Sequence, residues 1–186
     1  MIINFIRHGK TAGNTEKRFI GRTDEPLCDI GKDELKRIAY PECDIVAASP
    51  MKRCLQTAQI IYPTKKPMIY DELRECDFGI FDGRCHAELD GDPVYMKWIS
   101  NNGMTAPPEG EDVDGFRGRC VTGFLRAVRE NANCTVMSFV VHGGTIMSVL
   151  EKLAFPKREF YEYMTENGHG YVTEYDGEKL RILGKI

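Results

Sequence analysis

The sequence of 186 residues has no long apolar run, no excess of either charge and no C-x-x-C pair. Its longest apolar stretches are far shorter than the ~20 residues that a membrane-spanning helix needs. The amino-terminal segment also lacks the basic start of a secretory signal peptide. The 25 basic and 28 acidic residues are interspersed and give a net charge of −3, which does not indicate a nucleic-acid-binding protein. We therefore expect neither a membrane nor a nucleic-acid partner.

Seven cysteines are present, an odd number whose spacing fits neither a disulfide framework nor a zinc ribbon. We expect reduced thiols in a cytoplasmic protein. An H-E-x-x-H motif is also missing, so the sequence predicts no metal and no other cofactor.

Internal repeats, low-complexity segments and linkers are absent, and the length fits a single domain over residues 1–186. Short apolar runs alternate with helical patterns. Strands are predicted at 2–6, 44–48, 67–70 and 136–141, helices after Ser49-Pro50, over 111–131 and over 145–155, and a hairpin over 171–186. We expect Ser49 to cap its helix, with Pro50 at the first helical position. This alternation predicts an α/β fold, a three-layer αβα sandwich with an open, mostly parallel sheet, to which residues 84–111 add a small cap segment.

Charged and potentially catalytic side chains follow the predicted strands. Arg7 and His8 come after the first strand, Arg53 after the second, Glu75 after the third and His142 after the fourth. In an open parallel sheet the ligand site lies outside the carboxyl ends of the strands, so we expect these side chains to meet there.

Such a set suits phosphoryl transfer through a covalent intermediate. Arg7 and Arg53 could fork around a phosphate, and the Gly143 and Gly144 amides at a helix start could add backbone donors. His8 would be the nucleophile. Two histidines near carboxylates could also suggest zinc, but the arginines would repel a cation at the same place.

The same residues fall in motifs that resemble the histidine phosphatase superfamily, also called the phosphoglycerate mutase-like family. The motifs follow the family order from residue 7 to residue 146 and comprise Arg7-His8-Gly9 with Thr11 and Asn14; Gly21, Asp24, Pro26, Leu27 and Gly31; Ser49, Pro50, Arg53, Gln56, Thr57 and Ala58; Leu73, Glu75, Phe78, Gly79 and Gly83; Pro108, Gly110 and Glu111; and His142-Gly143-Gly144 with Ile146.

The resemblance implies a role for each motif residue. The histidine that becomes phosphorylated falls on His8, and the usual proton donor, also a candidate for activating water, falls on Glu75. Positions that hold the phosphoryl oxygens fall on Arg7, Arg53 and His142. Further phosphate or substrate contacts are expected at Asn14, Gly21, Thr23 and Gly143.

Several positions depart from the family pattern. Lys10 adds a positive charge close to the expected site, and Ile20 stands where the mutase branch has a hydroxyl residue. Both leave the substrate preference open.

The segment 84–111 bears on the choice between phosphatase and mutase. It holds two basic and five acidic residues, which suits a second anionic group poorly. Four of its aromatic and methionine side chains could either cover an organic leaving group or anchor the cap; they are Tyr95, Met96, Trp98 and Met104. The sequence thus favours a phosphomonoester phosphatase resembling the alpha-ribazole phosphatase branch, with a small phosphorylated metabolite as its substrate. A phosphoglycerate mutase and a non-catalytic phospho-ligand binding module remain the alternatives.

Overall fold

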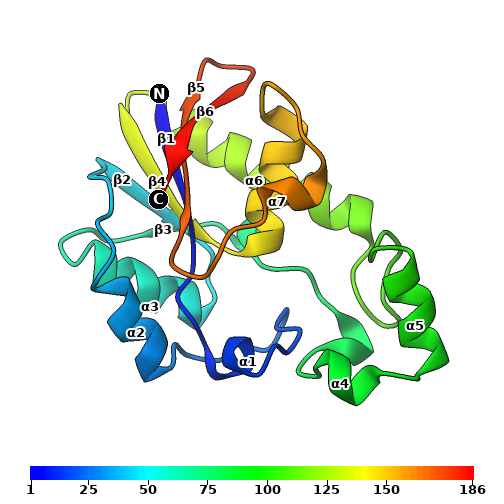
Figure 1. The fold of residues 1–186 in the computed structure, drawn as a ribbon. Helices are drawn as coiled ribbons and strands as arrows, with labels where there is room; N and C mark the ends of the chain where they lie inside the picture. The colour runs from blue at the N-terminus through cyan, green and yellow to red at the C-terminus, as the bar shows by residue number, and fades with distance from the viewer.

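The protein is built on one six-stranded sheet, as seen in a computed structural model that describes residues 1–186 (Figure 1). The strand order is β3-β2-β4-β1-β5-β6. The strands are β1 (Ile2–Arg7), β2 (Ile45–Ala48), β3 (Met68–Ile69), β4 (Val136–Val141), β5 (Gly170–Tyr175) and β6 (Leu180–Lys185). Strands β1 to β4 run parallel, whereas β5 and β6 form an antiparallel hairpin beside β1. The predicted open, mostly parallel sheet is confirmed.

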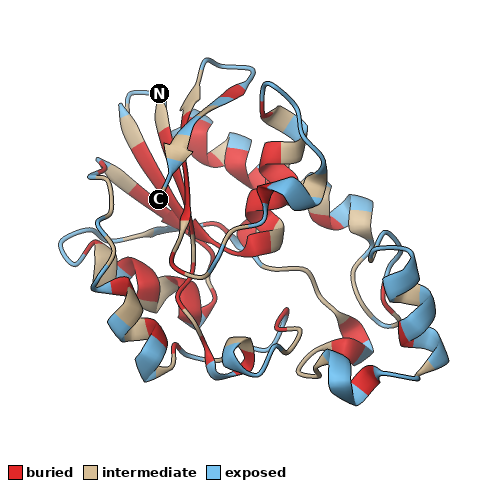
Figure 2. Ribbon diagram, viewed as in Figure 1, coloured by how far each residue is buried: buried red, intermediate tan, exposed pale blue.

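Alternating side chains on the central strands build a core on each face of the sheet. Phe5 and Phe139 belong to a cluster of 21 buried residues under helices α6 (Val113–Glu130) and α7 (Gly143–Leu153). Their neighbours Ile6 and Val140 belong to a second cluster under α3 (Lys52–Ile61). Because successive strand residues point to opposite faces, these strands are covered on both sides and form the middle of three layers (Figure 2).

The remaining helices are short. They are α1 (Ala12–Thr15), α2 (Asp29–Leu35), α4 (His86–Leu89), α5 (Pro93–Ser100) and the 3₁₀ turns Asp71–Leu73, Gly79–Phe81 and Phe160–Tyr163. None of the helices is long and apolar enough to cross a membrane. All seven cysteines are free thiols.

Helices α4 and α5 fall within the segment that the sequence predicts as a cap, and they project from the main body (Figure 1). Phe81, Leu89 and Tyr95 form a separate buried cluster there. Phe19, from the loop after α1, packs against this cluster and exchanges backbone hydrogen bonds with Gly83 and Arg84. The cap is thus bound to the amino-terminal loop rather than to the sheet.

The start of α3 differs from the prediction. The helix begins at Lys52 with Met51 at its N-cap, and the Met51 side chain makes no capping hydrogen bond, whereas Asp24 accepts from the N–H of Lys52 at 2.7 Å. Ser49 is buried instead, with its Oγ 2.8 Å from Nε2 of His142. The prediction of a Ser49 cap was wrong because this hydroxyl turns inward to a buried imidazole, a partner that local sequence does not reveal.

Candidate active site

The carboxyl ends of β1 and β4 bring two histidines together. These neighbouring parallel strands pair Arg7 with Val141, so His8 and His142 leave the sheet side by side. Their ring centroids are 5.2 Å apart and nearly perpendicular. The sheet thus places the two histidines at one point, as the topology rule for parallel sheets predicts.

His8 has its ring nitrogens in different roles. Its Nδ1 lies 2.8 Å from the carbonyl oxygen of Gly9, which only accepts hydrogen bonds, so Nδ1 carries the proton and Nε2 keeps its lone pair. Burial, and then the charges of Arg53 and Arg7, hold the pKa of His8 well below its ordinary value. His8 is therefore a neutral imidazole with a free nucleophilic nitrogen.

Arg7 borders the cavity beside His8 with an unused donor. One terminal nitrogen, Nη1, donates to the carbonyl of Thr165 at 2.7 Å. The buried Nε has no partner, and Gly143 is packed against it. A buried N–H without an acceptor is rare in folded proteins, so this one marks a place where an anion would be satisfied.

Arg53 and His142 lie fully buried behind His8. The Nε of Arg53 donates to Nδ1 of His142 at 3.3 Å, so the proton of His142 is on Nε2, which donates to Ser49. Burial, and then the charge of Arg53, lowers the pKa of His142 well below its ordinary value. Neither side chain borders the cavity, and the guanidinium places a fixed positive charge beneath the histidine pair.

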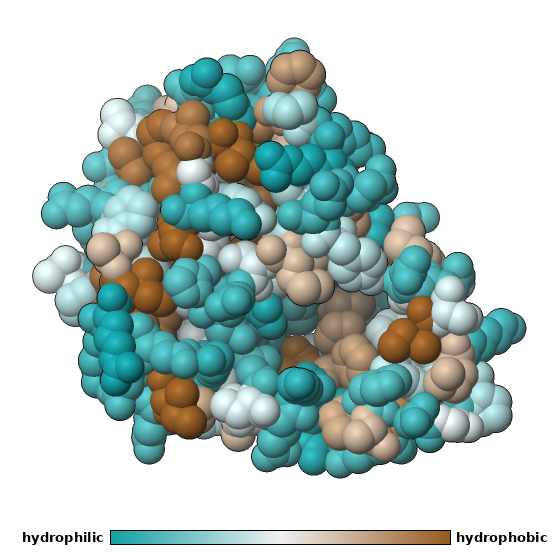
Figure 3. All heavy atoms as spheres, in the orientation of Figure 1, coloured by the Kyte–Doolittle hydropathy of each residue, from teal (hydrophilic) through white to brown (hydrophobic).

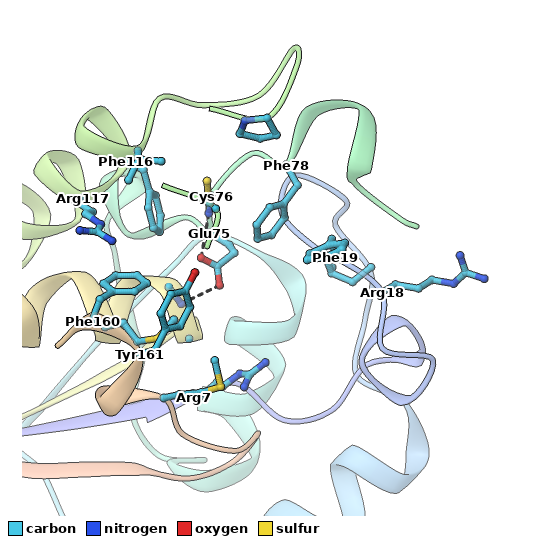
Figure 4. Close-up of a pocket in the computed structure, with 18 of the residues that line it drawn as sticks. Arg7, Arg18, Phe19, Glu75, Cys76, Phe78, Phe116, Arg117, Phe160 and Tyr161 are labelled. Atoms are coloured by element: carbon cyan, nitrogen blue, oxygen red, sulfur yellow. Dashed lines mark hydrogen bonds between the residues drawn. The ribbon is translucent and has the colours of Figure 1, made fainter. Parts of the chain in front are cut away.

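Glu75 points into the cavity from the loop after the turn Asp71–Leu73. Its carboxylate accepts from the backbone N–H groups of Cys76 at 3.0 Å and Gly144 at 3.2 Å (Figure 4). A Cβ at position 144 would lie 2.3 Å from Oε1 of Glu75, so the carboxylate can occupy this position only beside a glycine. The start of α7 therefore receives the carboxylate directly.

Asn14 also borders the cavity, through the capping turn of α1. Its Oδ1 accepts from the backbone of Thr11 and from Nδ2 of Asn167. With the oxygen engaged, the Nδ2 amide of Asn14 remains the donor that can serve a ligand.

Gly21 and Thr23 do not border this cavity. Their carbonyl oxygens accept from the terminal nitrogens of Arg53 at 3.0 and 2.8 Å. Their backbone N–H groups donate to the carboxylate of Asp82, which sequence reasoning missed. In this structure the loop 21–23 orients Arg53, and a side chain at position 21 would lie 2.0 Å from the carbonyl of Cys76.

The cavity has a volume of about 340 Å³ and opens between the main body and the cap, where the space-filling view is hollowed (Figure 3). Eleven of its 21 lining residues are hydrophobic. Sequence reasoning missed the wall opposite the cap, formed by Phe116 and Arg117 of α6 and by Phe160, Tyr161 and Met164. The available signal was the group of aromatic residues in the connection between α7 and the final hairpin.

Of the four apolar cap residues, one fits each expected role and two fit neither. Trp98 borders the cavity, whereas Tyr95 is buried inside the cap. Met96 and Met104 are exposed.

Lys10 keeps its positive charge but does not line the cavity. Its Nζ is 2.7 Å from Oε1 of Glu34 on α2, so the charge has a carboxylate partner outside the site. No three side chains of His, Cys, Asp or Glu lie close enough to form a metal site.

Comparisons with known proteins identify similar chains. A phosphoglycerate mutase-like protein 4 of Arabidopsis thaliana is 30% identical over 188 residues, which cover 95% of this chain and 81% of the relative. A broad-specificity phosphatase of Saccharomyces cerevisiae is 26% identical and covers 96% of this chain and 81% of its own length.

Solved structures show the same fold. An alpha-ribazole phosphatase from Shigella flexneri has a TM-score of 0.85 at 21% identity, covering 98% of this chain and 94% of that one. A phosphoglycerate mutase from Thermus thermophilus has a TM-score of 0.76 at 28% identity, covering 100% and 98%. The model of the histidine phosphatase superfamily (branch 1) matches residues 3–185. With that match over nearly its whole length, the chain belongs to the histidine phosphatase superfamily, branch 1.

Proposed function

We propose that this protein is a phosphomonoester phosphatase that works through a phosphohistidine at His8. The observation that carries the proposal is the tautomer of His8, because the bond from Nδ1 to Gly9 leaves Nε2 free beside the unpartnered Nε of Arg7. A neutral nitrogen nucleophile next to a donor for phosphoryl oxygens is the arrangement that a double displacement needs.

The first step forms a bond from Nε2 of His8 to phosphorus and breaks the bond from phosphorus to the leaving oxygen. Glu75, which faces the same cavity, donates a proton to that oxygen. In the second step its carboxylate takes a proton from water, the water oxygen attacks phosphorus, and the phosphohistidine bond breaks. Arg7, the Gly143 amide and Nδ2 of Asn14 would hold the phosphoryl oxygens.

Support for His142 and Arg53 as phosphate ligands comes from family motifs rather than from contact with the cavity. The charge of Arg53 lies beneath the histidine pair, where it would stabilise a phosphoryl group on His8. To reach a phosphoryl oxygen, either residue would have to change its present hydrogen bonds to Ser49, Thr23 and Gly21.

The wall of the cavity favours a leaving group with an apolar or aromatic part. Phe78 faces Phe116 and Phe160 across the cavity (Figure 4). Trp98 of the cap also lines this cavity. The compact cap and the H-G-G motif resemble the alpha-ribazole phosphatase branch, so alpha-ribazole 5′-phosphate is the first physiological substrate to test. The seven free cysteines support a reducing compartment such as the cytoplasm.

Mutase activity would need a second site for an anion. Arg18 and Arg117 are the further cations at the cavity, but Arg18 pairs with Glu16 and Glu88, and Arg117 pairs with Glu151. Because carboxylates already pair with both side chains, hydrolysis is favoured over transfer, even though the Nε of Arg117 has no partner. Incubation with 3-phosphoglycerate should release phosphate without forming 2-phosphoglycerate.

The test of the proposal is chemical trapping. Rapid quenching during turnover of a radiolabelled substrate should capture an acid-labile phosphate on His8, and Glu75→Gln should make it persist. Hydrolysis of p-nitrophenyl phosphate should be sensitive to vanadate and indifferent to EDTA. A wild-type enzyme that turns over a good substrate without any trapped phosphate would contradict the covalent mechanism, and a protein without any turnover would instead be a binding module.

A further inference from the structure

Arg119 on α6 uses all of its N–H donors to bind the Glu111 carboxylate and the backbone carbonyls around Glu75. A guanidinium has five N–H groups in a fixed plane. Its hydrogen bonds run from Nε and Nη2 to the two carboxylate oxygens of Glu111, each at 2.6 Å, from Nη1 to the carbonyls of Glu72 and Arg74 at 2.8 and 2.7 Å, and from Nη2 to the carbonyl of Glu75 at 3.0 Å. Arg119 therefore grips the backbone of the loop that carries Glu75.

Glu111 holds the other side of the same loop. Its backbone N–H donates to the carbonyl of Asp77 at 2.9 Å, and its Oε2 lies 3.5 Å from the backbone nitrogen of Asp77. The pair Arg119–Glu111 thus fixes the chain just before and just after Glu75 and Cys76.

This pair does not face the substrate cavity. Arg119 and Glu111 border a separate polar hollow, and Glu75 stands between the two spaces. The guanidinium of Arg119 lies 5.0 Å from the centre of the Phe116 ring, whose edge forms part of the substrate cavity. Arg119 therefore touches neither a substrate nor the reacting atoms.

The loop needs such an anchor because it has no regular structure of its own. Residues 74–78 belong to no helix or strand, and the carboxylate of Glu75 has only the N–H groups of Cys76 and Gly144 as partners. Its position therefore depends on where the backbone is held, and small errors in the position of a proton donor are costly.

We propose that Arg119 and Glu111 form a positioning pair that keeps Glu75 aligned for proton transfer to the leaving oxygen. The inference rests on the proposed function, since it assigns the pair to the proton-transfer step of that reaction. It predicts that loss of the pair lowers kcat/KM most for substrates whose leaving group has to be protonated.

The test is Arg119→Lys, which keeps the charge but has three donors and no planar fork. With β-glycerophosphate, whose alkoxide must be protonated, we expect kcat/KM to fall about 10- to 100-fold, part of the 10²–10⁴ that a general acid supplies. With 2,4-dinitrophenyl phosphate, whose phenolate leaves unaided, the fall should stay below about 3-fold. Glu111→Gln should show the same difference between the two substrates, and it replaces Arg119→Lys as the test if that variant does not fold.

Arg126→Lys is the matched control. Arg126 lies two turns further along the same helix, pairs with Glu72 at 2.6 Å and lies over the Tyr70 ring, but it does not contact Glu75. The Arg126→Lys variant should keep kcat/KM for both substrates within about 2-fold of the wild-type value.

Equal losses for both substrates in Arg119→Lys and Glu111→Gln, or no loss in either, would overturn the positioning role. In those outcomes phosphohistidine can still be trapped in the wild type, so the proposed function stands. A wild-type protein that hydrolyses neither compound and traps no phosphate would overturn the proposed function and this inference together.

Discussion

At the scale of single residues, one hydrogen bond decides which nitrogen of His8 can react. The carbonyl of Gly9 fixes the proton on Nδ1, and the N–H of Gly9 in turn donates to Thr57 on α3 at 3.0 Å. Thr57 also donates to the carbonyl of Arg53. The tautomer of His8 is therefore set by the backbone of Gly9, which the hydroxyl of Thr57 connects to α3.

The two buried histidines should make stability depend on pH. The pKa values of His8 and His142 are both lowered in the folded state, mainly by burial, whereas the unfolded chain has a histidine pKa near ~6.5. Below that value the unfolded state binds more protons, so stability is complete above about pH 7 and is lost as the pH falls through ~6.5.

The measurement is urea unfolding between pH 7.5 and 5.5. The free energy of unfolding should fall by roughly 1 kcal/mol per pH unit for each histidine below ~6.5. His8→Gln should remove about half of this dependence, whatever its own effect on stability. An equal slope in the wild type and the variant would contradict the linkage.

Strand ends and motifs predicted which residues lie at the site, but not the hydrogen bonds that these residues make with distant partners. Arg7, His8, Glu75 and Asn14 border one cavity, as their strand ends and motifs indicate. The inward turn of Ser49 and the pairing of Lys10 with Glu34 depend on distant partners, so no local pattern shows them. The oxygen acceptors of Gly21 and Thr23 also have no sequence signature, because a carbonyl is present at every residue.

At the scale of elements, the first turn of α7 connects the sheet to Glu75, the proposed proton donor. The helix begins directly after β4, and its second residue, Gly144, donates its N–H to Glu75. A helix start favours a carboxylate through its free N–H groups and its dipole. This element therefore sets the distance between the histidines and Glu75.

Replacing Gly144 should break the contact between its N–H and the carboxylate of Glu75. In Gly144→Ala the new methyl would lie 2.3 Å from Oε1 of Glu75 and 2.9 Å from the Phe116 ring. Glu75 has to move, so we expect kcat with β-glycerophosphate to fall at least 10-fold. Steady-state kinetics and a thermal melt on the same sample would measure it.

Gly118→Ala on α6 is the control for this substitution. Nothing lies within 4 Å of the methyl that it would add, and alanine in a helix interior stabilises by about 1 kcal/mol. Activity should be unchanged and the melting temperature slightly higher. A Gly144→Ala enzyme with full activity would show that Glu75 is not the proton donor or is not held at this N–H.

The order of the long elements was predictable, whereas one wall of the cavity was not. The apolar runs of β1, β2 and β4 are short, buried and covered on both faces, which is the pattern that the sequence analysis used. The wall formed by Phe160, Tyr161 and Met164 has no periodicity, because it is a 3₁₀ turn with flanking loop.

At the scale of the whole molecule, the main body and the cap differ greatly in the size of their buried cores and share one cavity. The sheet and its helices bury the large clusters, whereas the cap is centred on Phe81, Leu89 and Tyr95. Across the mouth of the cavity, the hydroxyl of Tyr161 donates to the carbonyl of Asn102 at 2.6 Å. The cap is held by Phe19 and Arg18 on one side, and by Tyr161 and a contact of Arg117 with Met104 on the other. Because its own buried cluster is small, we expect the cap to open more easily than the sheet.

Phe81→Ala should weaken the cap alone. The ring is fully buried and packs against Tyr95 and Trp98 at centroid distances of 5.4 and 5.3 Å. Its removal costs about 3–5 kcal/mol in a packed core, which is more than a cluster of this size can lose and remain closed. Hydrogen exchange followed by mass spectrometry should show faster exchange in peptides from 79–104, with 136–141 unchanged.

The catalytic consequences of Phe81→Ala follow from the division of the cavity. The proposed phosphate contacts come mainly from the ends of β1 and α7, whereas Trp98 belongs to the cap. Inhibition by vanadate should therefore stay within about 3-fold, while KM for an aromatic phosphomonoester rises about 10-fold, the effect of losing apolar contacts worth ~1.4 kcal/mol. If exchange accelerates equally in 136–141, the cap is not an independent unit, and if KM is unchanged, the cap does not bind the leaving group.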